Sequence, residues 1–411
     1  MTASFSTLVL AAGKGTRMKS DLPKVLHRAS GRSLLGHVLH AAAGAGAQNH
    51  VVVIGHGGEL VLNELKTQGF PFSEAWQREQ KGTGHAAQMA LPQLKTAQDL
   101  ILIVNGDGPL LKAETLTAMI EAHQAKKADL TLGVMELENP FGYGRVVGAK
   151  GGLKAIVEEK EASPAQKKIK IVNGGLYLVS RKYLAEFLPK LKASAKTGEF
   201  YLTDIVALGA AKKKKLQTFL IAPEELKGVN DLEQLAEVEG ILRQRLYSKW
   251  MKDGVKIDAP GNLYAEVTVS VAAGARLGPG VVLEGNTEIG KGSILEAGCV
   301  VKDSVVGEGV ELRAYSYLEN AVVGEGAQVG PFARLRPKAN LGRNTKVGNF
   351  VEVKNASLGD GTKVSHLSYV GDSVVGKDVN IGCGFIACNY DGVNKHTTTI
   401  EDGVFVGSGV Q

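Results

Sequence analysis

Short apolar runs alternate with helix-like segments in the N-terminal part of the chain, as far as position 230. Residues 7–10, 50–54 and 100–104 are almost entirely apolar. Residues 34–43 and 86–94, which lie between these runs, have the spacing of amphipathic helices. Short apolar strands separated by helices are typical of a parallel sheet that is covered on both faces. The pattern therefore predicts a doubly wound α/β domain, in which ligands bind beyond the carboxyl ends of the strands.

From position 277 onward the pattern changes to a hexapeptide repeat in which an aliphatic residue is often followed by glycine. Such pairs begin at positions 289, 306, 323, 341, 358 and 375, so they follow one another at a nearly constant interval that is close to three hexapeptides. Three short rungs then make one coil of a triangular prism, and the aliphatic residues stack inside it. The repeat predicts a parallel β-helix. Residues 389–399 break the repeat and are expected to form a projecting loop.

A helical segment separates the two patterns. Asn230 or Asp231 can cap it, and it is expected to end near Gly254. Its apolar face is formed by residues at helical spacing, namely Leu232, Leu235, Leu242 and Leu246. The predicted organisation is an α/β domain over 1–232, a linker helix over 233–253 and a β-helix domain over 254–411.

Charge and cysteine content narrow the class of protein. The net charge is +6, and the lysine run at 212–215 is typical of a solvated surface. We expect no nucleic-acid partner, because no known nucleic-acid-binding module is present. The three cysteines form no CxxC pair, which suits a reducing cytoplasm. No signal peptide and no apolar stretch long enough to cross a bilayer is found, so a cytoplasmic location without a membrane span is expected.

A glycine-rich loop follows the first strand. Its sequence is Gly13-Lys14-Gly15-Thr16-Arg17, and Pro23-Lys24 comes shortly after. Glycines let backbone N–H groups approach a polyphosphate, and Arg17 and Lys24 add full positive charges. A bare G-x-G occurs in many tight turns, and this one lacks the Walker and dinucleotide-binding spacings. The longer string resembles the signature of sugar-nucleotide pyrophosphorylases, which join a nucleoside triphosphate to a sugar 1-phosphate.

A carboxylate follows the third strand. Asp107 ends the segment Asn105-Gly106-Asp107, where it can hold Mg²⁺ against phosphate oxygens. The resemblance implies Asn230 as a second ligand. From its position alone, Asn230 would be a helix cap, and the two roles are compatible.

Further segments at 77–85, 142–145, 156–160 and 172–175 resemble one bacterial family. Its members are bifunctional N-acetylglucosamine-1-phosphate uridylyltransferases and glucosamine-1-phosphate N-acetyltransferases. The resemblance implies a Rossmann-like nucleotidyltransferase domain followed by a left-handed parallel β-helix of hexapeptide repeats. It implies contacts to the nucleotide by Leu10, Ala11, Ala12, Gly13, Lys24, Gln77, Gly82 and Thr83. It also implies sugar contacts by Gly144, Glu158 and Asn173, although Glu158 alone would be taken for a solvated surface charge.

The second half of the chain resembles the acetyltransferase half of the same family. The matching segments are 332–337, 348–354, 366–372, 380–384 and 388–392. Amine acylation needs a base, and His366 matches it, although a lone histidine in a β-helix is more often structural. Arg336 and Lys354 are expected to hold the sugar phosphate, and Tyr369 and Asn380 the sugar hydroxyls. Implied contacts to acetyl-coenzyme A are Cys383, Asn389, Tyr390 and Ser408, with Lys395 as a further candidate.

Spacing supports this second site. Lys354 follows Arg336 by one full interval of the repeat, and Tyr369 follows Lys354 by a slightly shorter one. Residues about one coil apart stack on neighbouring coils, so these groups are expected to converge.

The resemblance implies two reactions. Acetyl transfer from acetyl-coenzyme A to glucosamine 1-phosphate is followed by Mg²⁺-dependent uridylyl transfer from UTP, with release of pyrophosphate. The product, UDP-N-acetylglucosamine, serves peptidoglycan and lipopolysaccharide synthesis. A homotrimer with acetyl-transfer sites between β-helices is implied in the same way.

Some positions depart from the family pattern. Asn105 replaces a tyrosine, Gly108 a valine and Cys383 an alanine. The sequence stops at Gln411, before the family's last coils and basic arm, so acetyl transfer is expected to be weaker than uridylyl transfer. One alternative is a pyrophosphorylase of other specificity whose β-helix serves only assembly or regulation. Another is a non-catalytic scaffold, which would require the loss of Arg17, Lys24 or Asp107.

Overall fold

The computed structural model describes residues 4–95, 98–149 and 152–411. By its internal contacts the chain divides into two compact units, Met1–Glu239 and Gly240–Gln411. The border falls within helix α9 (Leu232–Lys252), in the segment for which the sequence predicts a linker helix. Within the described ranges, no helix combines the length and the apolar composition needed to cross a bilayer.

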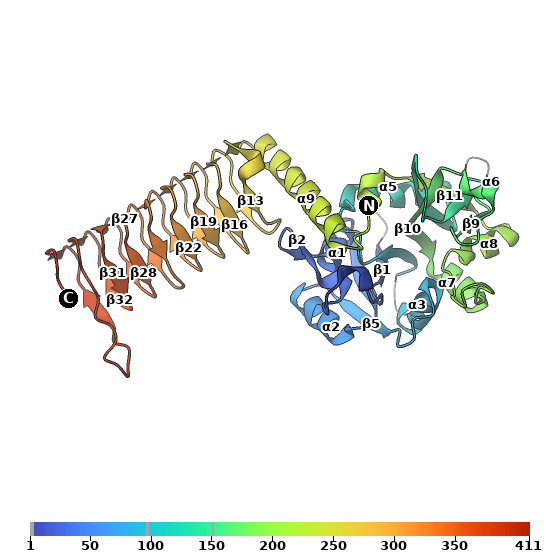
Figure 1. Ribbon diagram of the computed structural model, residues 1–411, viewed down its shortest axis with the longest axis horizontal. Coiled ribbons are helices and arrows are strands. Elements are labelled where there is room, and N and C mark those ends of the chain that lie inside the picture. The colour runs from blue at the N-terminus through green and yellow to red at the C-terminus, as the bar shows by residue number, and fades with distance from the viewer. Residues whose placement is uncertain (1–3, 96–97, 150–151) are drawn as a thin grey trace. The chain divides into compact units, whose positions relative to one another are not determined.

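The first unit is built around one twisted sheet (Figure 1). Its main path, in spatial order, is β11 (Leu216–Leu220), β7 (Leu130–Glu136), β10 (Ile171–Ser180), β6 (Leu100–Asn105), β1 (Phe5–Leu10), β4 (Ala47–Ile54) and β5 (Phe72–Trp76). Strand β1 pairs in parallel with β4 and β6, as the sequence predicts. Strand β10 instead runs antiparallel to both β6 and β7. The expectation of a wholly parallel sheet is therefore wrong at β10, because apolar content does not encode strand direction.

Two short strands extend this sheet beside β10. They are β8 (Arg145–Val147) and β9 (Ala155–Val157), which pair with each other antiparallel. Strand β8 also pairs with β10 through Arg145 and Val172. A separate small hairpin joins β2 (Arg28–Ala29) to β3 (Arg32–Ser33).

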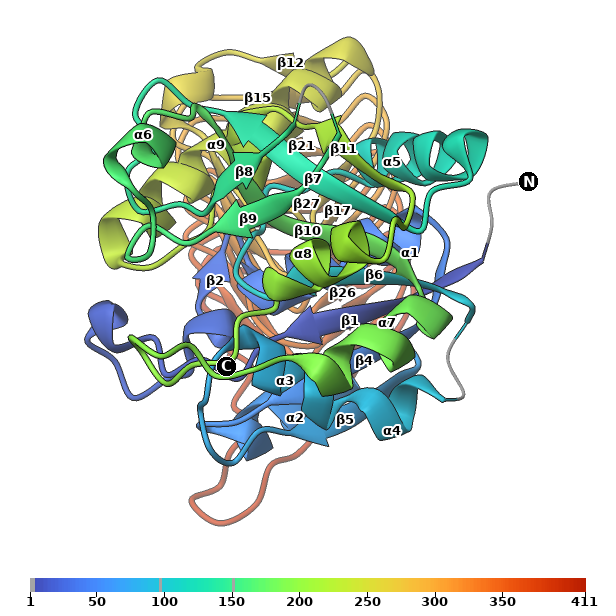
Figure 2. The same cartoon turned by 90° about the vertical axis from the view of Figure 1, so that its right-hand side faces the viewer.

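Helices cover both faces of the sheet (Figure 2). One face packs against α1 (Leu34–Gly44), α2 (Gly58–Thr67) and α5 (Ala113–Lys126). The other packs against α3 (Thr83–Met89), α4 (Leu91–Leu94), α7 (Arg181–Phe187) and α8 (Asp204–Ala211). Neighbouring strand residues such as Leu8 and Val9 belong to opposite cores, which explains the uninterrupted apolar runs. A further short helix, α6 (Pro164–Lys167), follows β9.

The single helix expected at 86–94 is divided into α3 and α4. The break lies at Ala90, and Pro92 occupies the first turn of α4. Proline has no N–H to continue the earlier helix but is well suited to the start of a new one.

Three described histidines of the first unit, His37, His50 and His123, are buried, and burial shifts the pKa most strongly in His37 and His50. His37 on α1 has its Nε2 2.9 Å from the Ala29 carbonyl oxygen, and His50 on β4 has its Nδ1 2.7 Å from Thr7 Oγ1. Burial disfavours the charged imidazolium, and it lowers the pKa of each side chain from 6.5 to about 4. Between about pH 4 and pH 6.5, these histidines bind more protons in the unfolded chain than in the folded one. The stability contributed by these histidines is therefore full above the unfolded pKa and is lost as the pH falls toward 4.

Acidification from about pH 7 to about pH 4 is expected to destabilise the first unit by up to about 3 kcal/mol for each histidine. Hydrogen exchange of the β4 amides across this range measures the change for that unit within the full chain. The variant His37→Gln/His50→Asn lacks both ionisable groups, so its exchange should depend less on pH. Equal pH dependence in the parent chain and the variant would contradict the assignment.

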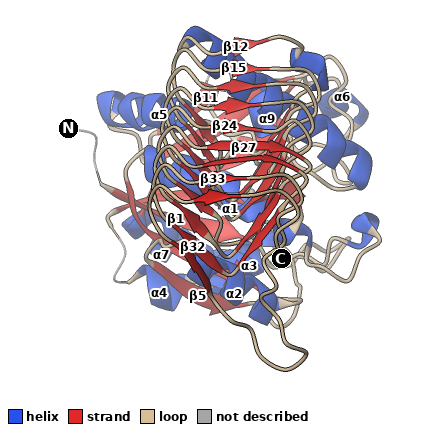
Figure 3. Cartoon of the chain, turned by 90° about the vertical axis from the view of Figure 1, so that its left-hand side faces the viewer, coloured by secondary structure: helices blue, strands red, loops and turns tan. Residues whose placement is uncertain are grey.

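The second unit is a left-handed parallel β-helix (Figure 3). Its strands form three sheets, one along each side of the prism. The first contains β12 (Lys256–Ile257), β15 (Arg276–Leu277), β18 (Ile294–Leu295), β21 (Glu311–Leu312), β24 (Gln328–Val329), β27 (Lys346–Asn349), β30 (Lys363–His366), β33 (Asn380–Ile381) and β35 (Phe405–Val406). The second contains β13 (Tyr264–Ala265), β16 (Val282–Glu284), β19 (Val300–Lys302), β22 (Tyr317–Glu319), β25 (Arg334–Leu335), β28 (Glu352–Lys354) and β31 (Tyr369–Gly371). The third contains β14 (Ser270–Val271), β17 (Glu288–Ile289), β20 (Val305–Val306), β23 (Val322–Val323), β26 (Asn340–Leu341), β29 (Ser357–Leu358), β32 (Ser373–Val375) and β34 (Thr398–Ile400).

The repeat maps directly onto this architecture. Val306 pairs with Val323, and Val323 with Leu341, so the interval between successive aliphatic–glycine pairs is one coil. The repeated aliphatic residues fill a continuous core inside the prism. Residues 389–397 form a loop that leaves the coils between β33 and β34, as the break in the repeat predicts (Figure 1).

One corner of the prism carries a strip of exposed apolar side chains, here called the aromatic strip. Its members are Tyr315, Phe332, Phe350 and Leu367, each with a positive φ and each about half exposed or more. The ring centroids of Tyr315 and Phe332 are 5.4 Å apart, and those of Phe332 and Phe350 are 5.5 Å apart, with nearly parallel planes. Bulky residues are rare in this left-handed backbone region, which glycine and asparagine favour.

Helix α9 is capped by Asp231, because the backbone N–H of Gln234 donates to Asp231 Oδ1 over 2.8 Å. The alternative cap, Asn230, points its side chain elsewhere. Leu232 is 57% exposed and Leu242 is buried, so the apolar face of the helix is only partly covered. The helix ends at Lys252, shortly before Gly254.

Candidate functional site

Two adjoining cavities lie at the carboxyl ends of β1 and β6. The larger has a volume of about 570 Å³ and the smaller about 400 Å³. Asn105 and Asp107, at the end of β6, line both. Ligands of doubly wound folds bind at this edge of the sheet.

The glycine-rich loop brings Lys24 beside the end of β6. Gly15 has φ +61°, and a Cβ atom on it would lie 2.5 Å from the Lys24 Cβ. Any side chain at this position would therefore displace Lys24 as well as strain the backbone. The Lys24 ammonium forms an ion pair with the Asp107 carboxylate. Lys24 thus connects the glycine-rich loop to the end of β6.

Asn230 completes this cluster from the segment before α9. Its Oδ1 accepts a hydrogen bond of 2.9 Å from Arg17 and lies 3.3 Å from Lys24 Nζ. The side-chain oxygens of Asp107 and Asn230 therefore both lie close to the ammonium nitrogen of Lys24. Among the described residues, no group of three His, Cys, Asp or Glu side chains is arranged to hold a metal ion. A carboxylate and an amide oxygen nevertheless fit Mg²⁺, which commonly takes its other ligands from phosphates and water.

The smaller cavity contains the residues expected to recognise the base. Gln77, Gly82 and Thr83 all line it, as do Leu10, Ala11, Ala12 and Gly13 from the end of β1 and the loop after it. Gly82 has φ +96°, and a Cβ atom there would lie 2.6 Å from the Phe200 carbonyl oxygen. Gln77 donates from Nε2 to the Gly82 carbonyl oxygen over 2.9 Å. The amide of Gln77 therefore also holds the turn that borders the cavity.

The residues expected to contact the sugar meet beside the larger cavity. Gly144 and Asn173 line it, and the Asn173 N–H donates to the Gly144 carbonyl oxygen over 2.8 Å. A Cβ atom on Gly144 would lie 3.5 Å from Glu158 Oε2, so Glu158 belongs to the same group. The Asn173 amide donates to the Tyr177 hydroxyl over 2.9 Å.

Glu158 is largely screened from water, unlike the surface charge that its position alone would indicate. Burial raises the pKa of its carboxyl group, and the carboxylates of Asp204, Glu161 and Glu199 act in the same direction. The Thr203 hydroxyl opposes this shift by donating to Glu158 Oε1 over 3.0 Å.

The second group of candidates lies on neighbouring coils of the β-helix. Asn349 pairs with His366, and His366 Nδ1 is 3.1 Å from Asn349 Oδ1. With the Asn349 amide oxygen as the acceptor, Nδ1 is the donor, and in a neutral ring this leaves Nε2 able to accept a proton. Sequence reasoning missed Asn349, although it precedes His366 by one full coil of the repeat.

One expectation about this group needs correction. Tyr369 pairs with Glu352, and Lys354 pairs with Gly371, so Lys354 and Tyr369 do not stack directly. Their separation along the chain falls short of the full coil that direct stacking requires. Arg336, expected to hold a phosphate, donates to Glu352 Oε1 over 2.7 Å, and this ion pair raises the pKa of its guanidinium.

The remaining candidates lie toward the last coils. Asn389 Nδ2 donates to the carboxylate of Asp372 and lies 3.4 Å from the Tyr369 hydroxyl. Hydrogen bonds from Asn355 and Asn389 lower the pKa of Asp372 despite its burial. Cys383 and Gly409 are joined by a backbone hydrogen bond, which places Ser408 on the adjacent coil. Asn380 pairs with Phe405, and Tyr390 with Lys395 in the inserted loop.

Several residues at the two cavities were not singled out from the sequence. Gln80 lines the smaller cavity and donates to the Ala12 carbonyl oxygen over 2.6 Å. Glu199 lines the same cavity, and Phe141 and Tyr143 line the larger one. Gln80 and Tyr143 lie within recognised segments and Phe141 adjoins one, whereas Glu199 lies far from them along the chain.

Both halves of the chain are similar to known proteins. Residues 7–198 match a family model described as a MobA-like NTP transferase domain, and residues 261–339 match a GMPPB C-terminal domain. The bifunctional protein GlmU of Acinetobacter baumannii (strain AYE) is 44% identical over 408 residues, which cover 98% of this chain and 88% of the relative. The protein of the same name from Alkaliphilus metalliredigens is 42% identical over 403 residues, with coverage of 98% and 87%. The chain belongs to the family of bifunctional GlmU proteins.

Proposed function

We propose that this chain makes UDP-N-acetylglucosamine from glucosamine 1-phosphate in two steps. Acetyl transfer from acetyl-coenzyme A comes first, and uridylyl transfer from UTP follows. Membership of the GlmU family supports both activities. The observation that carries the uridylyl assignment is the cluster of Lys24, Asp107, Asn230 and Arg17 where the two cavities meet. There a nucleotide in the smaller cavity and a sugar phosphate in the larger one can react.

The uridylyl step is an in-line displacement at phosphorus. A phosphate oxygen of N-acetylglucosamine 1-phosphate bonds to the α-phosphorus of UTP, and the bond from that phosphorus to the β-phosphate bridging oxygen breaks. Pyrophosphate leaves with the electron pair. Arg17 and Lys24 compensate the developing negative charge, so the rate depends on positioning and electrostatics without a covalent intermediate.

Asp107 and Asn230 are proposed as the protein ligands of Mg²⁺. The divalent ion would neutralise phosphate charge and orient the phosphates. In the absence of nucleotide, the Lys24 ammonium supplies positive charge to both oxygens. Lys24 is therefore expected to turn toward the phosphates when they bind.

The sugar-binding part of the site depends on Gly144, Glu158 and Asn173. The ionised Glu158 carboxylate accepts hydrogen bonds from sugar hydroxyls, and Asn173 is held in place by Tyr177. Buried polar groups that match a ligand's hydrogen bonds reject analogues that lack them. These residues are therefore proposed to select the sugar.

The acetyl step takes place on the β-helix. His366 Nε2 removes a proton from the glucosamine amine, and the nitrogen bonds to the thioester carbonyl carbon. The carbon–sulfur bond breaks with its electron pair on sulfur, which takes up that proton and leaves as the thiol of coenzyme A. Lys354, Tyr369 and Asn380 are proposed to hold the sugar phosphate, together with Arg336 once it exchanges Glu352 for the phosphate. Cys383, Asn389, Tyr390 and Ser408 are proposed for the coenzyme A side, with Lys395 nearby.

The assembly is proposed to be a homotrimer. The aromatic strip supports association, since contiguous exposed apolar residues are costly to leave in water. Sedimentation equilibrium of the full chain tests this proposal directly, and a monomer at micromolar concentration would exclude it.

Paired assays of both half-reactions test the function. The first follows pyrophosphate release with UTP, ATP, GTP or dTTP and several sugar 1-phosphates. The second follows coenzyme A thiol release with glucosamine 1-phosphate. Preference for UTP and N-acetylglucosamine 1-phosphate is expected. Preference for another nucleotide or sugar, without thiol release, would assign the chain to a pyrophosphorylase of different specificity.

Replacement of Thr203 by valine is expected to move the acidic limb of the uridylyl pH profile to higher pH. The Thr203 hydrogen bond lowers the pKa of Glu158, and its loss leaves the effect of burial unopposed. More sites would then carry a protonated Glu158 at a given pH. The measurement is kcat/KM for N-acetylglucosamine 1-phosphate as a function of pH. Thr117→Val is the matched control, because Thr117 bonds only to its own helix at Ala113, and an unshifted limb in Thr203→Val would exclude this role.

A further inference from the structure

A solvent-exposed phenylalanine stands at the rim of the larger cavity. Phe141 lines this cavity yet is 76% exposed, more than any other aromatic side chain in the described ranges. Scattered exposed apolar residues are common on protein surfaces. Phe141 differs in that its ring borders a cavity otherwise lined mainly by polar residues and glycines.

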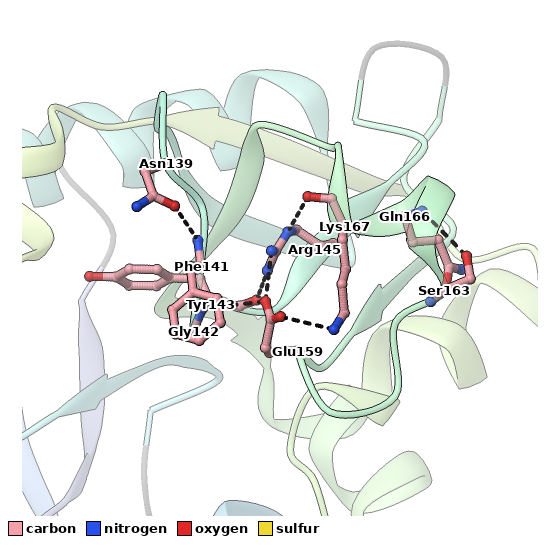
Figure 4. A network of polar contacts seen from close by, with 9 residues as sticks. All are labelled: Asn139, Phe141, Gly142, Tyr143, Arg145, Glu159, Ser163, Gln166 and Lys167. Atoms are coloured by element: carbon pink, nitrogen blue, oxygen red, sulfur yellow. Dashed lines mark hydrogen bonds and ion pairs between the residues drawn. The ribbon is translucent and has the colours of Figure 1, made fainter.

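The loop that carries Phe141 is held at several backbone atoms (Figure 4). The Phe141 N–H donates to Asn139 Oδ1 over 3.2 Å, and the Gly142 N–H donates to Glu159 Oε2 over 3.3 Å. Farther along, the Tyr143 carbonyl oxygen accepts from the guanidinium of Arg145. The loop is thus tied to side chains on both sides of Phe141.

The hydrogen bonds of Gly142 and Tyr143 connect the loop to an ion pair between Arg145 and Glu159. Arg145 is only 2% exposed, and its Nη2 lies 2.7 Å from Glu159 Oε2. Lys167 approaches the other oxygen of Glu159 at 3.3 Å (Figure 4). Removing one member of a buried ion pair destabilises the fold, so this pair holds the foot of the loop in place. The foot of the loop is therefore held in place, whereas the Phe141 ring at its tip is exposed to solvent.

We infer that Phe141 is a sugar-binding residue that packs its ring against the pyranose of the sugar 1-phosphate. This inference rests on the proposed function, which places the sugar in the larger cavity. A hexose presents an apolar face of C–H groups, and covering that face with an aromatic ring removes apolar surface of both partners from water. Because the loop is already ordered, little conformational entropy opposes the contact.

The position of the ring separates the sugar from the nucleotide. Phe141 lines the larger cavity with Gly144 and Asn173, whereas Gln77 and Thr83 line the smaller one. The two cavities share Asp107. Truncation of the ring therefore weakens binding of the sugar phosphate and leaves UTP binding unchanged.

Steady-state kinetics of Phe141→Ala in the full chain test the inference. The expected result is an approximately tenfold higher KM for N-acetylglucosamine 1-phosphate, because the substitution removes an apolar contact of moderate area. The KM for UTP is expected to stay within about twofold, because the ring does not contact the nucleotide. The kcat is also expected to stay within about twofold, because the ring would bind the sugar equally in the ground state and the transition state. Phe141→Tyr keeps the ring and should restore the parental KM. Leu220→Ala, which shortens another exposed apolar side chain (65% exposed) away from both cavities, is the matched control.

The outcomes separate this inference from the proposed function. An unchanged KM for the sugar phosphate in Phe141→Ala, or an equal rise for UTP, overturns the inference while the function stands. If the parent chain does not turn over these substrates, the proposed function fails. Phe141→Trp then tests binding alone: a blue shift of its emission on adding N-acetylglucosamine 1-phosphate, beyond that of the parent, supports the contact, and no difference overturns it.

Discussion

Uridylyl transfer is expected to fall by about 100- to 1,000-fold when Asp107 is replaced by alanine. The carboxylate is the only negatively charged member of the described cluster formed with Lys24, Asn230 and Arg17. Its loss removes the charged ligand proposed for Mg²⁺ and leaves the Lys24 ammonium without its ion pair. The backbone should be preserved, because the Asp107 carbonyl oxygen still accepts from the Val229 N–H over 3.0 Å.

Pyrophosphate release at saturating UTP and sugar phosphate measures this effect. Acetyl transfer by the same preparation serves as an internal control, since it uses the β-helix. Asp99→Ala is the matched variant: Asp99 forms an ion pair with Arg181, is 93% exposed in its side chain and lies outside both cavities. Asp107→Asn keeps the size of the side chain and should be nearly as inactive. Retention of full activity by either Asp107 variant would show that the charge is not required.

Replacement of His366 by alanine is expected to lower acetyl transfer by about 100- to 10,000-fold, the range typical of lost general base catalysis. The glucosamine amine is a nucleophile only after it loses a proton. The contact with Asn349 Oδ1 fixes the hydrogen on Nδ1 and leaves Nε2 free to accept that proton. The side chain is exposed, so its removal should cost little stability.

Coenzyme A thiol release measures this loss, and uridylyl transfer by the same variant should remain at the parental rate. Asn349→Ala keeps the imidazole but removes its orienting partner, so a smaller loss is expected. Added imidazole should partly restore activity to His366→Ala. Parental acetyl transfer in His366→Ala would exclude the histidine as the base, and equal loss of both activities would indicate general damage.

Periodic features were the most predictable from sequence. The constant interval between aliphatic–glycine pairs identified the coils of the β-helix, because each coil packs only on its neighbours. It also placed the loop at 389–399, and the structure ends this loop two residues earlier, where β34 begins. The continuous apolar strands of the first unit likewise followed from burial on both faces. Direction was not encoded in this pattern, and strand β10 is antiparallel.

Partners of polar side chains were less predictable. From its position in the sequence, Glu158 would be taken for a surface charge. In the structure, burial raises the pKa of its carboxyl group, and Thr203, which is distant in sequence, donates a hydrogen bond to it. The partner of Arg336 was likewise not evident from the sequence, because its guanidinium donates to Glu352 on the next coil. Such contacts join residues from separate elements, and local propensity carries no information about them.

The sequence by itself determined the two architectures, the phosphate-binding loop and the residue types available for each reaction. These follow from local periodicity and from short motifs, whose chemistry depends on neighbours along the chain. Only the tertiary structure decided which cation faces Asp107, which ring nitrogen of His366 lies against Asn349, and that Phe141 stands at the rim of a cavity. Each of these depends on elements that meet only after folding, since hydrogen bonding and burial are set by three-dimensional neighbours.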